Sequence, residues 1–210
     1  MTGWSGGLHI RAGQVPVADW LCGWCLAHRR ATGEHWERQF CIMAARLGKV
    51  FTPHQIGKPG VAASAYGVEG REWRQWLLPD VTVWSAPGEH HEIKHKNPTR
   101  DGCYGLEEYR IASLVRFANT TGQQVLYTIH DWQHAGCRSS REPCENRLQD
   151  WVFADIADLS RATVGVSSRR SPSYVNGERR EVTVRYWSAA AHFRPLSMLW
   201  LPPAAVESAS

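Results

Sequence analysis

Two carboxylates and a lysine lie close together near the middle of the sequence. Asp80 opens the run Asp-Val-Thr-Val-Trp, and Glu92-Ile93-Lys94 follows after a turn at Ala86-Pro87-Gly88. Both flanking runs have an extended, partly alternating pattern, which predicts two strands joined as a hairpin. Because side chains alternate along a strand, Glu92 and Lys94 must share one face, and pairing across the hairpin can bring Asp80 to that face.

These residue types suit phosphodiester hydrolysis. Carboxylates at a sheet edge supply hard oxygen ligands for Mg²⁺ or Mn²⁺, and a neighbouring lysine can orient a water molecule and stabilise charge developing at phosphorus. The uncatalysed reaction is so slow that a catalyst must remove on the order of 20 kcal/mol of barrier, which favours a metal-assisted route. A Glu-x-Lys sequence alone is common and is usually paired surface charge, so the surrounding sequence determines whether it indicates a catalytic site.

A helix is predicted upstream, from Glu34 to Leu47, with Thr32 as its N-cap and Gly48 closing it. Another stretch of helical spacing, Val17–His28, precedes it. The predicted buried face of the Glu34–Leu47 helix consists of Trp36, Phe40, Met43, Ala44 and Leu47.

Further elements surround the hairpin. A short strand is predicted within Lys49–His54, and the glycine- and proline-rich stretch Gly57–Gly70 predicts a flexible connection. Downstream, Leu106–Ala118 has a helical apolar stripe, and Val125–Ile129, after Gly122, is typical of a buried strand. These segments predict the order helix, strands, helix, strand.

The C-terminal part gives two further predictions. Trp151–Leu159 is predicted to be helical, and Asn176-Gly177, within Tyr174–Trp187, is a strong hairpin signal. We divide the chain into an N-terminal extension (1–31), a core (32–132) and a C-terminal addition packed on that core (133–210).

The arrangement of motifs resembles the PD-(D/E)XK nuclease superfamily. Pro79-Asp80 precedes Glu92-x-Lys94 by a hairpin's length, a helix containing Glu37 lies upstream, and a helix and strand follow. The resemblance covers about Thr32–Trp132. It implies an α/β fold with a restriction-endonuclease-like αβββαβ core, in which helices flank a mixed central sheet that carries N- and C-terminal additions.

Within that superfamily the chain looks most like archaeal-type Holliday junction resolvases and related phage or mobile-element nucleases. Their first helix carries Glu-Arg-x-hydrophobic and ends in glycine, as Glu37-Arg38-Gln39-Phe40 and Gly48 do here. The stretch Gly105–Tyr109, with Arg116-Phe117-Ala118 and Gly122, resembles the family's second helix and its return to a strand.

The resemblance also implies roles. Asp80 and Glu92 look like ligands of Mg²⁺ or Mn²⁺, with the backbone carbonyl of Ile93 as a further ligand. Lys94 looks like the water-orienting and charge-stabilising group. Glu37 resembles the helix carboxylate that completes the site.

Several neighbouring residues have competing interpretations. Glu34, one turn before Glu37, could take its place, and either acid could merely complement the helix dipole. His90 and His91 lack the spacing of a tetrahedral metal site and are interpreted as turn histidines.

Five polar residues are candidates for contacting nucleic-acid phosphates, although a solvated surface explains them about equally well. Two extend the strand beyond Lys94, one follows that strand, and two lie on the second helix: His95, Lys96, Arg100, Tyr109 and Arg110.

The cysteines outside the core leave two interpretations open. Cys22 and Cys25 could join Cys137 and Cys144 in a structural zinc site. The second spacing is loose, however, and buried free cysteine is common, so free thiols are favoured. A Cys/His hydrolase using Cys41 or Cys103 ranks last, because no nucleophile signature accompanies either residue.

Together these features predict a metal-dependent nuclease, an endonuclease acting on branched or duplex DNA. The alternative is a non-catalytic DNA-binding or assembly protein that keeps the nuclease fold. The formal net charge of +4 is only mildly basic. No membrane span or export signal is recognised, so a cytoplasmic location is expected. Resolvases act as C2 dimers, so a homodimer is a further expectation.

Overall fold

The structure is a computed structural model. It describes residues 3–5, 8–10, 26–54, 63–64, 75–76, 79–85, 88–131, 146–175 and 178–201. The predicted zinc ligands Cys22, Cys25, Cys137 and Cys144 lie outside the described residues, as does most of the stretch predicted to be a flexible connection. No helix in the described part of the chain is long and apolar enough to cross a membrane.

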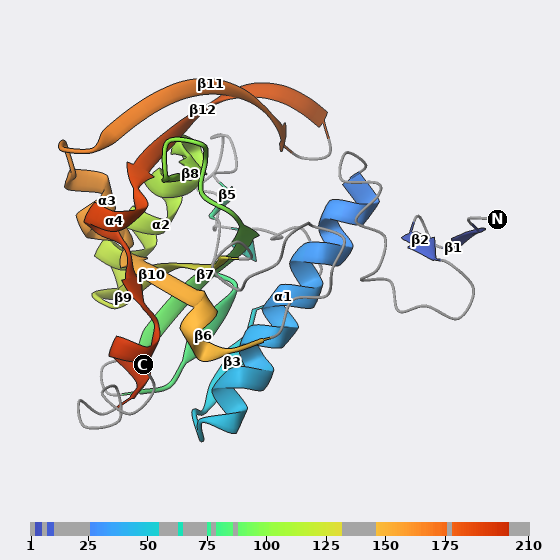
Figure 1. Cartoon of the computed structure of the whole chain (residues 1–210), viewed down its shortest axis with the longest axis vertical. Coiled ribbons are helices and arrows are strands. Elements are labelled where there is room, and N and C mark those ends of the chain that lie inside the picture. The colour runs from blue at the N-terminus through green and yellow to red at the C-terminus, as the bar shows by residue number, and fades with distance from the viewer. Residues whose placement is uncertain are drawn as a thin grey trace.

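A mixed six-stranded sheet forms the centre of the molecule (Figure 1). Its order is β13-β10-β9-β7-β6-β3. The strands are β3 (Phe51–Pro53), β6 (Val81–Val83), β7 (Glu89–Lys96), β9 (Gln124–Asp131), β10 (Trp151–Asp155) and β13 (Arg194–Pro195). The pair β7 and β9 is parallel and the other pairs are antiparallel. This mixed sheet with flanking helices confirms the predicted fold class.

The predicted hairpin is present as β6 and β7. Val81 pairs with His91 and Val83 pairs with Glu89 in antiparallel register. The parallel strand β9 lies on the other side of β7, where Glu92 pairs with Tyr127 and Lys94 pairs with Ile129. The strand that carries the predicted chemistry is therefore internal to the sheet, which holds its register on both sides.

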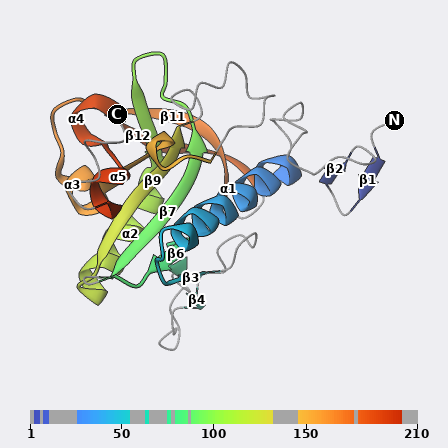
Figure 2. The same cartoon turned by 60° about the horizontal axis from the view of Figure 1, so that its bottom comes forward.

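Helix α1 (Leu26–Arg46) covers one face of the sheet, in front of β7 in Figure 2. The prediction that Thr32 caps this helix is wrong, because α1 begins six residues earlier in a run of good helix formers, Leu-Ala-His-Arg-Arg-Ala. Its C-terminal end is as predicted: Gly48 has a φ of 68°. The core on this face contains Trp36, Phe40, Cys41, Met43, Ala44, Val81, Val83, Ile93, Trp151, Leu196 and Trp200.

Helix α2 (Glu108–Thr121) packs on the opposite face with α3 (Ile156–Arg161). It ends where predicted, since Gly122 adopts a φ of 65° and its N–H donates to the carbonyl of Ala118. The second core lies between these helices and the sheet: Tyr104, Leu106, Ile111, Leu114, Val125, Tyr127, Ile129, Ala154, Ile156, Leu159 and Trp187.

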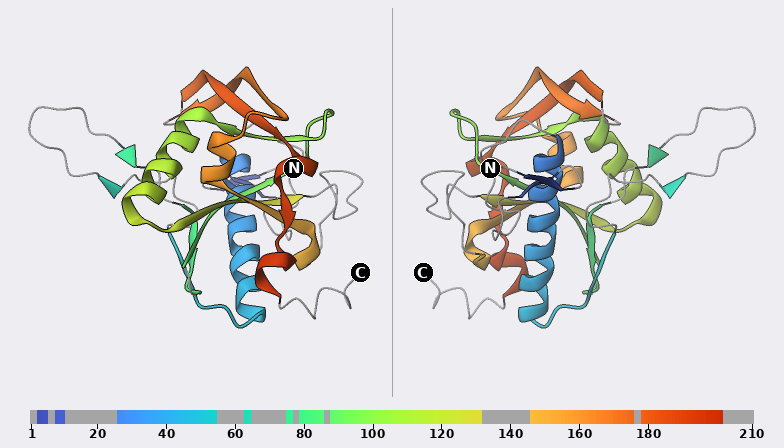
Figure 3. Two further views of the ribbon diagram at one scale, coloured as in Figure 1. Left: turned by 90° about the vertical axis from the view of Figure 1, so that its left-hand side faces the viewer. Right: turned by 90° about the vertical axis from the view of Figure 1, so that its right-hand side faces the viewer.

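A second sheet has the order β11-β12-β8 and consists of β8 (Cys103–Glu107), β11 (Val166–Val175) and β12 (Glu178–Ser188). All its pairs are antiparallel. Val175 pairs with Glu178, so β11 and β12 form the hairpin that Asn176-Gly177 predicts. Figure 3 shows this hairpin at one end of the molecule, away from the C-terminal end of α1.

The prediction of a helix over Trp151–Leu159 is wrong in its first half. Trp151–Asp155 forms β10, which pairs with β9 and β13, and only Ile156–Arg161 is helical. Asp155 marks the change, because its side chain accepts a hydrogen bond from the N–H of Ala157 as an N-cap. Sheet pairing overrides the local helical pattern at Trp151.

Short elements complete the described chain. They are β1 (Gly3–Ser5), β2 (Leu8–Ile10), β4 (Ala63–Ser64), β5 (Gln75–Trp76), the 3₁₀ turn η3 (Leu148–Asp150), α4 (Ala189–His192) and α5 (Ser197–Trp200).

Candidate active site

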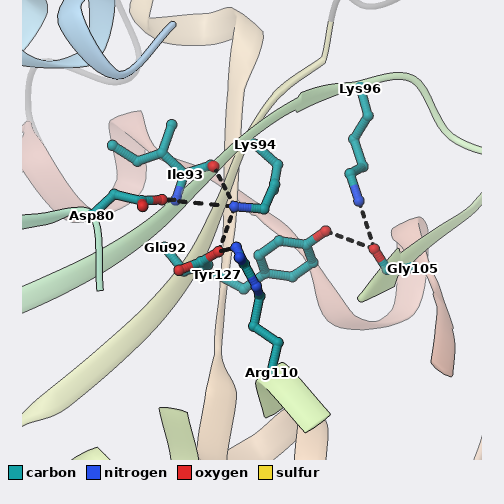
Figure 4. Close-up of polar contacts among 8 residues, drawn as sticks. All are labelled: Asp80, Glu92, Ile93, Lys94, Lys96, Gly105, Arg110 and Tyr127. Atoms are coloured by element: carbon teal, nitrogen blue, oxygen red, sulfur yellow. Dashed lines mark hydrogen bonds and ion pairs between the residues drawn. The ribbon is translucent and has the colours of Figure 1, made fainter. Parts of the chain in front are cut away.

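Asp80, Glu92 and Lys94 converge beside the centre of β7 (Figure 4). The Lys94 ammonium lies 3.7 Å from Oδ2 of Asp80. It also donates to Oε1 of Glu92 and, at 2.9 Å, to the backbone carbonyl of Ile93. One positively charged nitrogen thus has three oxygen atoms around it, two of them carboxylate oxygens.

The backbone explains this convergence. Glu92 and Lys94 are two residues apart on β7 and therefore face the same side, while Ile93 points to the α1 side and joins its core. The N–H of Asp80 donates to the carbonyl of His91 at 2.8 Å, which continues the β6–β7 pairing to the start of β6. The Asp80 carboxylate in turn accepts from the N–H of Ile93 at 2.7 Å.

Arg110 reaches the same site from α2. Its Nη1 donates to Oε1 of Glu92, the oxygen that Lys94 also contacts. The Glu92 side chain is only 2% exposed, so its charge depends on these two cations for compensation. We predicted Arg110 only as a phosphate contact, and the structure gives it a direct partner within the site.

The two carboxylates differ in acidity. Burial and the Glu92 charge raise the pKa of Asp80 from 3.8 to about 6, despite Lys94 and Arg110 nearby. Burial would also raise the pKa of Glu92, but Arg110 and Lys94 outweigh it and hold that pKa below its usual value. Partial burial lowers the pKa of Lys94, whose side chain is 25% exposed, but the Glu92 carboxylate outweighs it and keeps that pKa above its usual value. At neutral pH the site therefore contains two carboxylates and two cations.

A second lysine, Lys96, lies two residues after Lys94 on β7. Lys96 donates to the carbonyl of Gly105 at 2.6 Å, and the hydroxyl of Tyr127 donates to the same oxygen at 2.8 Å. Burial lowers the pKa of Lys96 to about 8. Gly105 lies on β8, so this contact joins the central sheet to the second sheet.

Gly105 has no room for a side chain. A Cβ there would lie 2.6 Å from Cε1 of Tyr186 and 2.9 Å from Cγ1 of Val184. We expect Gly105→Ala to lower the free energy of unfolding by about 1–3 kcal/mol, because β8 and β12 would be forced apart. Urea denaturation measures this.

Gly33→Ala is the matched control. A Cβ at Gly33 meets nothing within 4 Å, and the residue is inside α1. This variant should gain up to about 1 kcal/mol from helix propensity. If the two glycine variants change stability by the same amount and in the same direction, the steric explanation for Gly105 is wrong.

Glu37 is half-buried on α1, the helix that covers the opposite face of β7 from Glu92 and Lys94. Within the described residues, no group of three or more histidine, cysteine, aspartate or glutamate side chains is placed to hold a metal. The structure therefore does not gather Glu37 with Asp80 and Glu92, and its role stays a prediction. The side chain of its competitor, Glu34, lies outside the described residues.

His95 lies on the α1 side of β7. Its ring stacks on Trp36 at 4.4 Å between centroids, and its Nδ1 lies 3.1 Å from Nδ1 of His130. Burial, with His130 and His35 nearby, lowers the pKa of His95 to about 3. His95 is therefore neutral at physiological pH, which weakens its case as a phosphate contact.

The interpretation of His90 and His91 as turn residues is wrong. Both are buried within β7, where His90 contacts Thr82 and His91 contacts Thr128 through their Nδ1 atoms, each at 2.8 Å. Threonine hydroxyls on neighbouring strands satisfy these rings, which is why they can occupy a buried strand.

The other predicted phosphate contacts are at the surface. Arg100 is exposed in the turn after β7, and Tyr109, on the first turn of α2, is 38% exposed. Their contact with nucleic acid stays a prediction.

Cys41 is not suited to nucleophilic catalysis. It lies on α1 and is buried in the core, and burial, aided by the charge of Glu37, raises the pKa of its thiol to about 11. A thiol with this pKa is almost wholly protonated at neutral pH.

Sequence reasoning missed Gly105 and Tyr127 as parts of the site's surroundings. Tyr127 is the one residue with a polar tip in the buried run Val-Leu-Tyr, and a buried tyrosine hydroxyl requires a partner. That signal could have identified Tyr127, whereas its partner on β8 depends on the tertiary fold.

The donor set fits a hard divalent cation. The Asp80 and Glu92 carboxylates and the Ile93 carbonyl are the oxygen types that Mg²⁺ and Mn²⁺ prefer. In the structure these three oxygens surround the Lys94 ammonium, which shows that they can face one positive charge together.

Comparisons with known proteins found matches among solved structures only. No protein-family model matches the chain, and no curated protein matches it. Among solved structures, the chain is similar to a Holliday junction resolvase of the archaeal hyperthermophile Archaeoglobus fulgidus, with 15% identity and a TM-score of 0.40. The match covers 84% of this chain and 96% of the resolvase.

Proposed function

We propose that this protein is a metal-dependent nuclease that hydrolyses phosphodiester bonds within duplex or branched DNA. The observation that carries the proposal is the convergence of Asp80, Glu92 and the Ile93 carbonyl on one cation, the Lys94 ammonium. Convergent oxygens next to a cationic side chain are what hydrolysis of a phosphodiester requires.

Each residue has a distinct role in this proposal. Asp80, Glu92 and the carbonyl of Ile93 would hold Mg²⁺ or Mn²⁺, which when bound supplies Lewis-acid stabilisation of the phosphoryl oxygens. Lys94 orients the attacking water and stabilises negative charge at phosphorus. Arg110 positions Glu92 by binding its Oε1.

The test is cleavage of labelled duplex, single-stranded and four-way-junction DNA with Mg²⁺ or Mn²⁺, and with EDTA. We expect cutting that needs the metal and that Asp80→Asn abolishes, because an amide is a poor ligand compared with a carboxylate. The preferred substrate would identify the type of nuclease. Cutting that persists in EDTA, or in the Asp80→Asn variant, would contradict the proposal.

The second candidate is a DNA-binding protein that retains the fold without catalysis. The observation in its favour is that Glu37 is not gathered with Asp80 and Glu92, so the predicted carboxylate set is not brought together among the described residues. DNA binding with no cutting of any substrate would establish this candidate.

A further inference from the structure

The ribbon formed by β11 and β12 arches over one end of the molecule (Figures 1 and 3). Strand β11 is the edge strand of its sheet, and all four residues from Ser167 to Arg170 are exposed. Successive strand residues point to opposite faces, so this stretch buries neither face. Hydrophobic burial therefore does not explain this stretch, whereas Val166 before it and Trp187 opposite Val166 on β12 pack in the second core.

The exposed stretch carries two arginines that form only solvent-exposed ion pairs with carboxylates. Arg169 pairs with Asp101 at 2.9 Å and Arg170 pairs with Glu181 at 3.7 Å, and the arginine side chains are 58% and 74% exposed. Exposed ion pairs contribute little to stability, whereas a guanidinium can bind phosphate through two parallel hydrogen bonds. Phosphate can therefore compete for both arginines.

The ribbon is connected to the candidate active site through β8. Tyr186 on β12 pairs with Gly105 on β8, and the Gly105 carbonyl accepts hydrogen bonds from Lys96 and Tyr127. The Arg169 guanidinium lies 5.5 Å from the centre of the Tyr186 ring. A chain of direct contacts thus runs from the strand that carries Lys94 to Arg169 on one face of the ribbon.

We infer that Arg169 and Arg170 on this ribbon bind the phosphate backbone of duplex DNA. This inference rests on the proposed function, and it names the form of the substrate. The ten residues of β11 span about 33 Å at a rise of about 3.3 Å per residue, which is close to one turn of B-form DNA.

Shape and chemistry favour duplex DNA over the other nucleic acids. The major groove of B-form DNA admits a two-stranded β-ribbon, whereas that of A-form RNA is deep and narrow. Single strands are usually bound on aromatic side chains, and the exposed stretch consists of serine and arginine. Serine hydroxyls and guanidinium groups are typical phosphate contacts.

The test measures equilibrium binding of a short labelled duplex of mixed sequence over a series of salt concentrations, with EDTA present. We compare wild type with Arg169→Gln/Arg170→Gln. Each phosphate contact contributes about 0.9 to the slope of log affinity against log salt, so the double variant should lower the slope by about 1.8. Its affinity at low salt should fall by about tenfold or more.

The matched control is Arg46→Gln/Arg194→Gln, which removes the same charge. Both residues are exposed, at the end of α1 and on the edge strand β13 respectively. This variant should keep the wild-type slope and affinity. Arg169→Lys/Arg170→Lys should restore most of the slope, because phosphate contacts by lysine release counterions in the same way.

Three results would overturn the inference. Wild type could fail to bind duplex DNA, or the ribbon and control variants could lose affinity for it equally. The ribbon variant could also lose as much affinity for a single strand, or for duplex RNA, as it loses for duplex DNA. Because EDTA prevents metal-dependent cutting, the test does not require catalysis. Ribbon-dependent binding without any cutting in Mg²⁺ would support the ribbon and refute the nuclease.

Discussion

Replacing Lys94 by methionine is expected to slow DNA cleavage by about 1,000-fold, equivalent to about 4 kcal/mol of lost transition-state stabilisation. The ammonium contacts both carboxylates and the Ile93 carbonyl, so it lies where charge would develop during hydrolysis. Methionine preserves most of the side-chain volume but has no charge. The single-turnover cleavage rate with Mn²⁺ measures the effect.

Measuring metal affinity distinguishes the role proposed for Lys94 from the role proposed for the carboxylates. Lys94→Met should bind Mn²⁺ at least as tightly as wild type, because it removes a positive charge from among the proposed ligands. Asp80→Asn should instead weaken Mn²⁺ binding by at least about tenfold, since a carboxylate ligand is lost. Calorimetric titration distinguishes the two variants.

Lys49→Met is the control for this experiment. Lys49 lies in the turn between α1 and β3, with its ammonium 5.9 Å from the Trp200 ring centre. We expect its cleavage rate and metal affinity to match wild type. Near-normal cleavage by Lys94→Met would show that Lys94 does not have the catalytic role proposed here.

The second large effect concerns stability, and the two carboxylates should respond in opposite directions. At pH 7.5, Glu92→Gln is expected to lower the free energy of unfolding by about 3–5 kcal/mol, because it leaves Arg110 and Lys94 without their shared buried partner. The pKa of Glu92 is held below its usual value, so its stabilising effect is present above pH 4.5 and is lost only in stronger acid.

Asp80→Asn is expected to raise the free energy of unfolding by about 1–3 kcal/mol at pH 7.5. Because the pKa of Asp80 rises from 3.8 to about 6 on folding, the native state loses stability as pH increases from about 4 to 6. An amide does not titrate and avoids that loss. The gain should therefore shrink as pH falls from 6 towards 4.

Urea denaturation at pH 7.5 and pH 4.5 tests both variants. Asp80 is 21% exposed and Glu92 is 2% exposed, so the effect at Glu92 should be the larger one. If both substitutions destabilise the protein equally at pH 7.5, the charge distribution assigned to this site is incorrect. If Asp80→Asn is more stable than wild type but does not cut DNA, the Asp80 carboxylate is retained for function and not for stability.

Local patterns in the sequence were sufficient to predict much of the central sheet. The β6–β7 hairpin follows from the β-branched run Val81–Val83 and the extended pattern after the turn, and Gly48 and Gly122 end their helices with positive φ as expected. Asn176-Gly177 predicted the pairing of β11 with β12. These features depend on neighbouring residues, whose preferences a sequence displays directly.

The errors arose where distant segments compete with local preference. Trp151–Asp155 resembles part of a helix, but pairing with β9 and β13 makes it a strand. His90 and His91 resemble turn residues until Thr82 and Thr128 on neighbouring strands satisfy their rings. No local pattern identifies such partners.

The candidate site likewise combines features set by local sequence with features set by long-range packing. Alternation along β7 by itself determined that Glu92 and Lys94 share a face, and the hairpin placed Asp80 close to them. Only the tertiary structure decided that α2 brings Arg110 to Glu92, that α1, the helix of Glu37, covers the other face of β7, and that β8 joins Lys96 to the ribbon. Those relations depend on how helices and sheets pack, which is determined by burial over the whole chain.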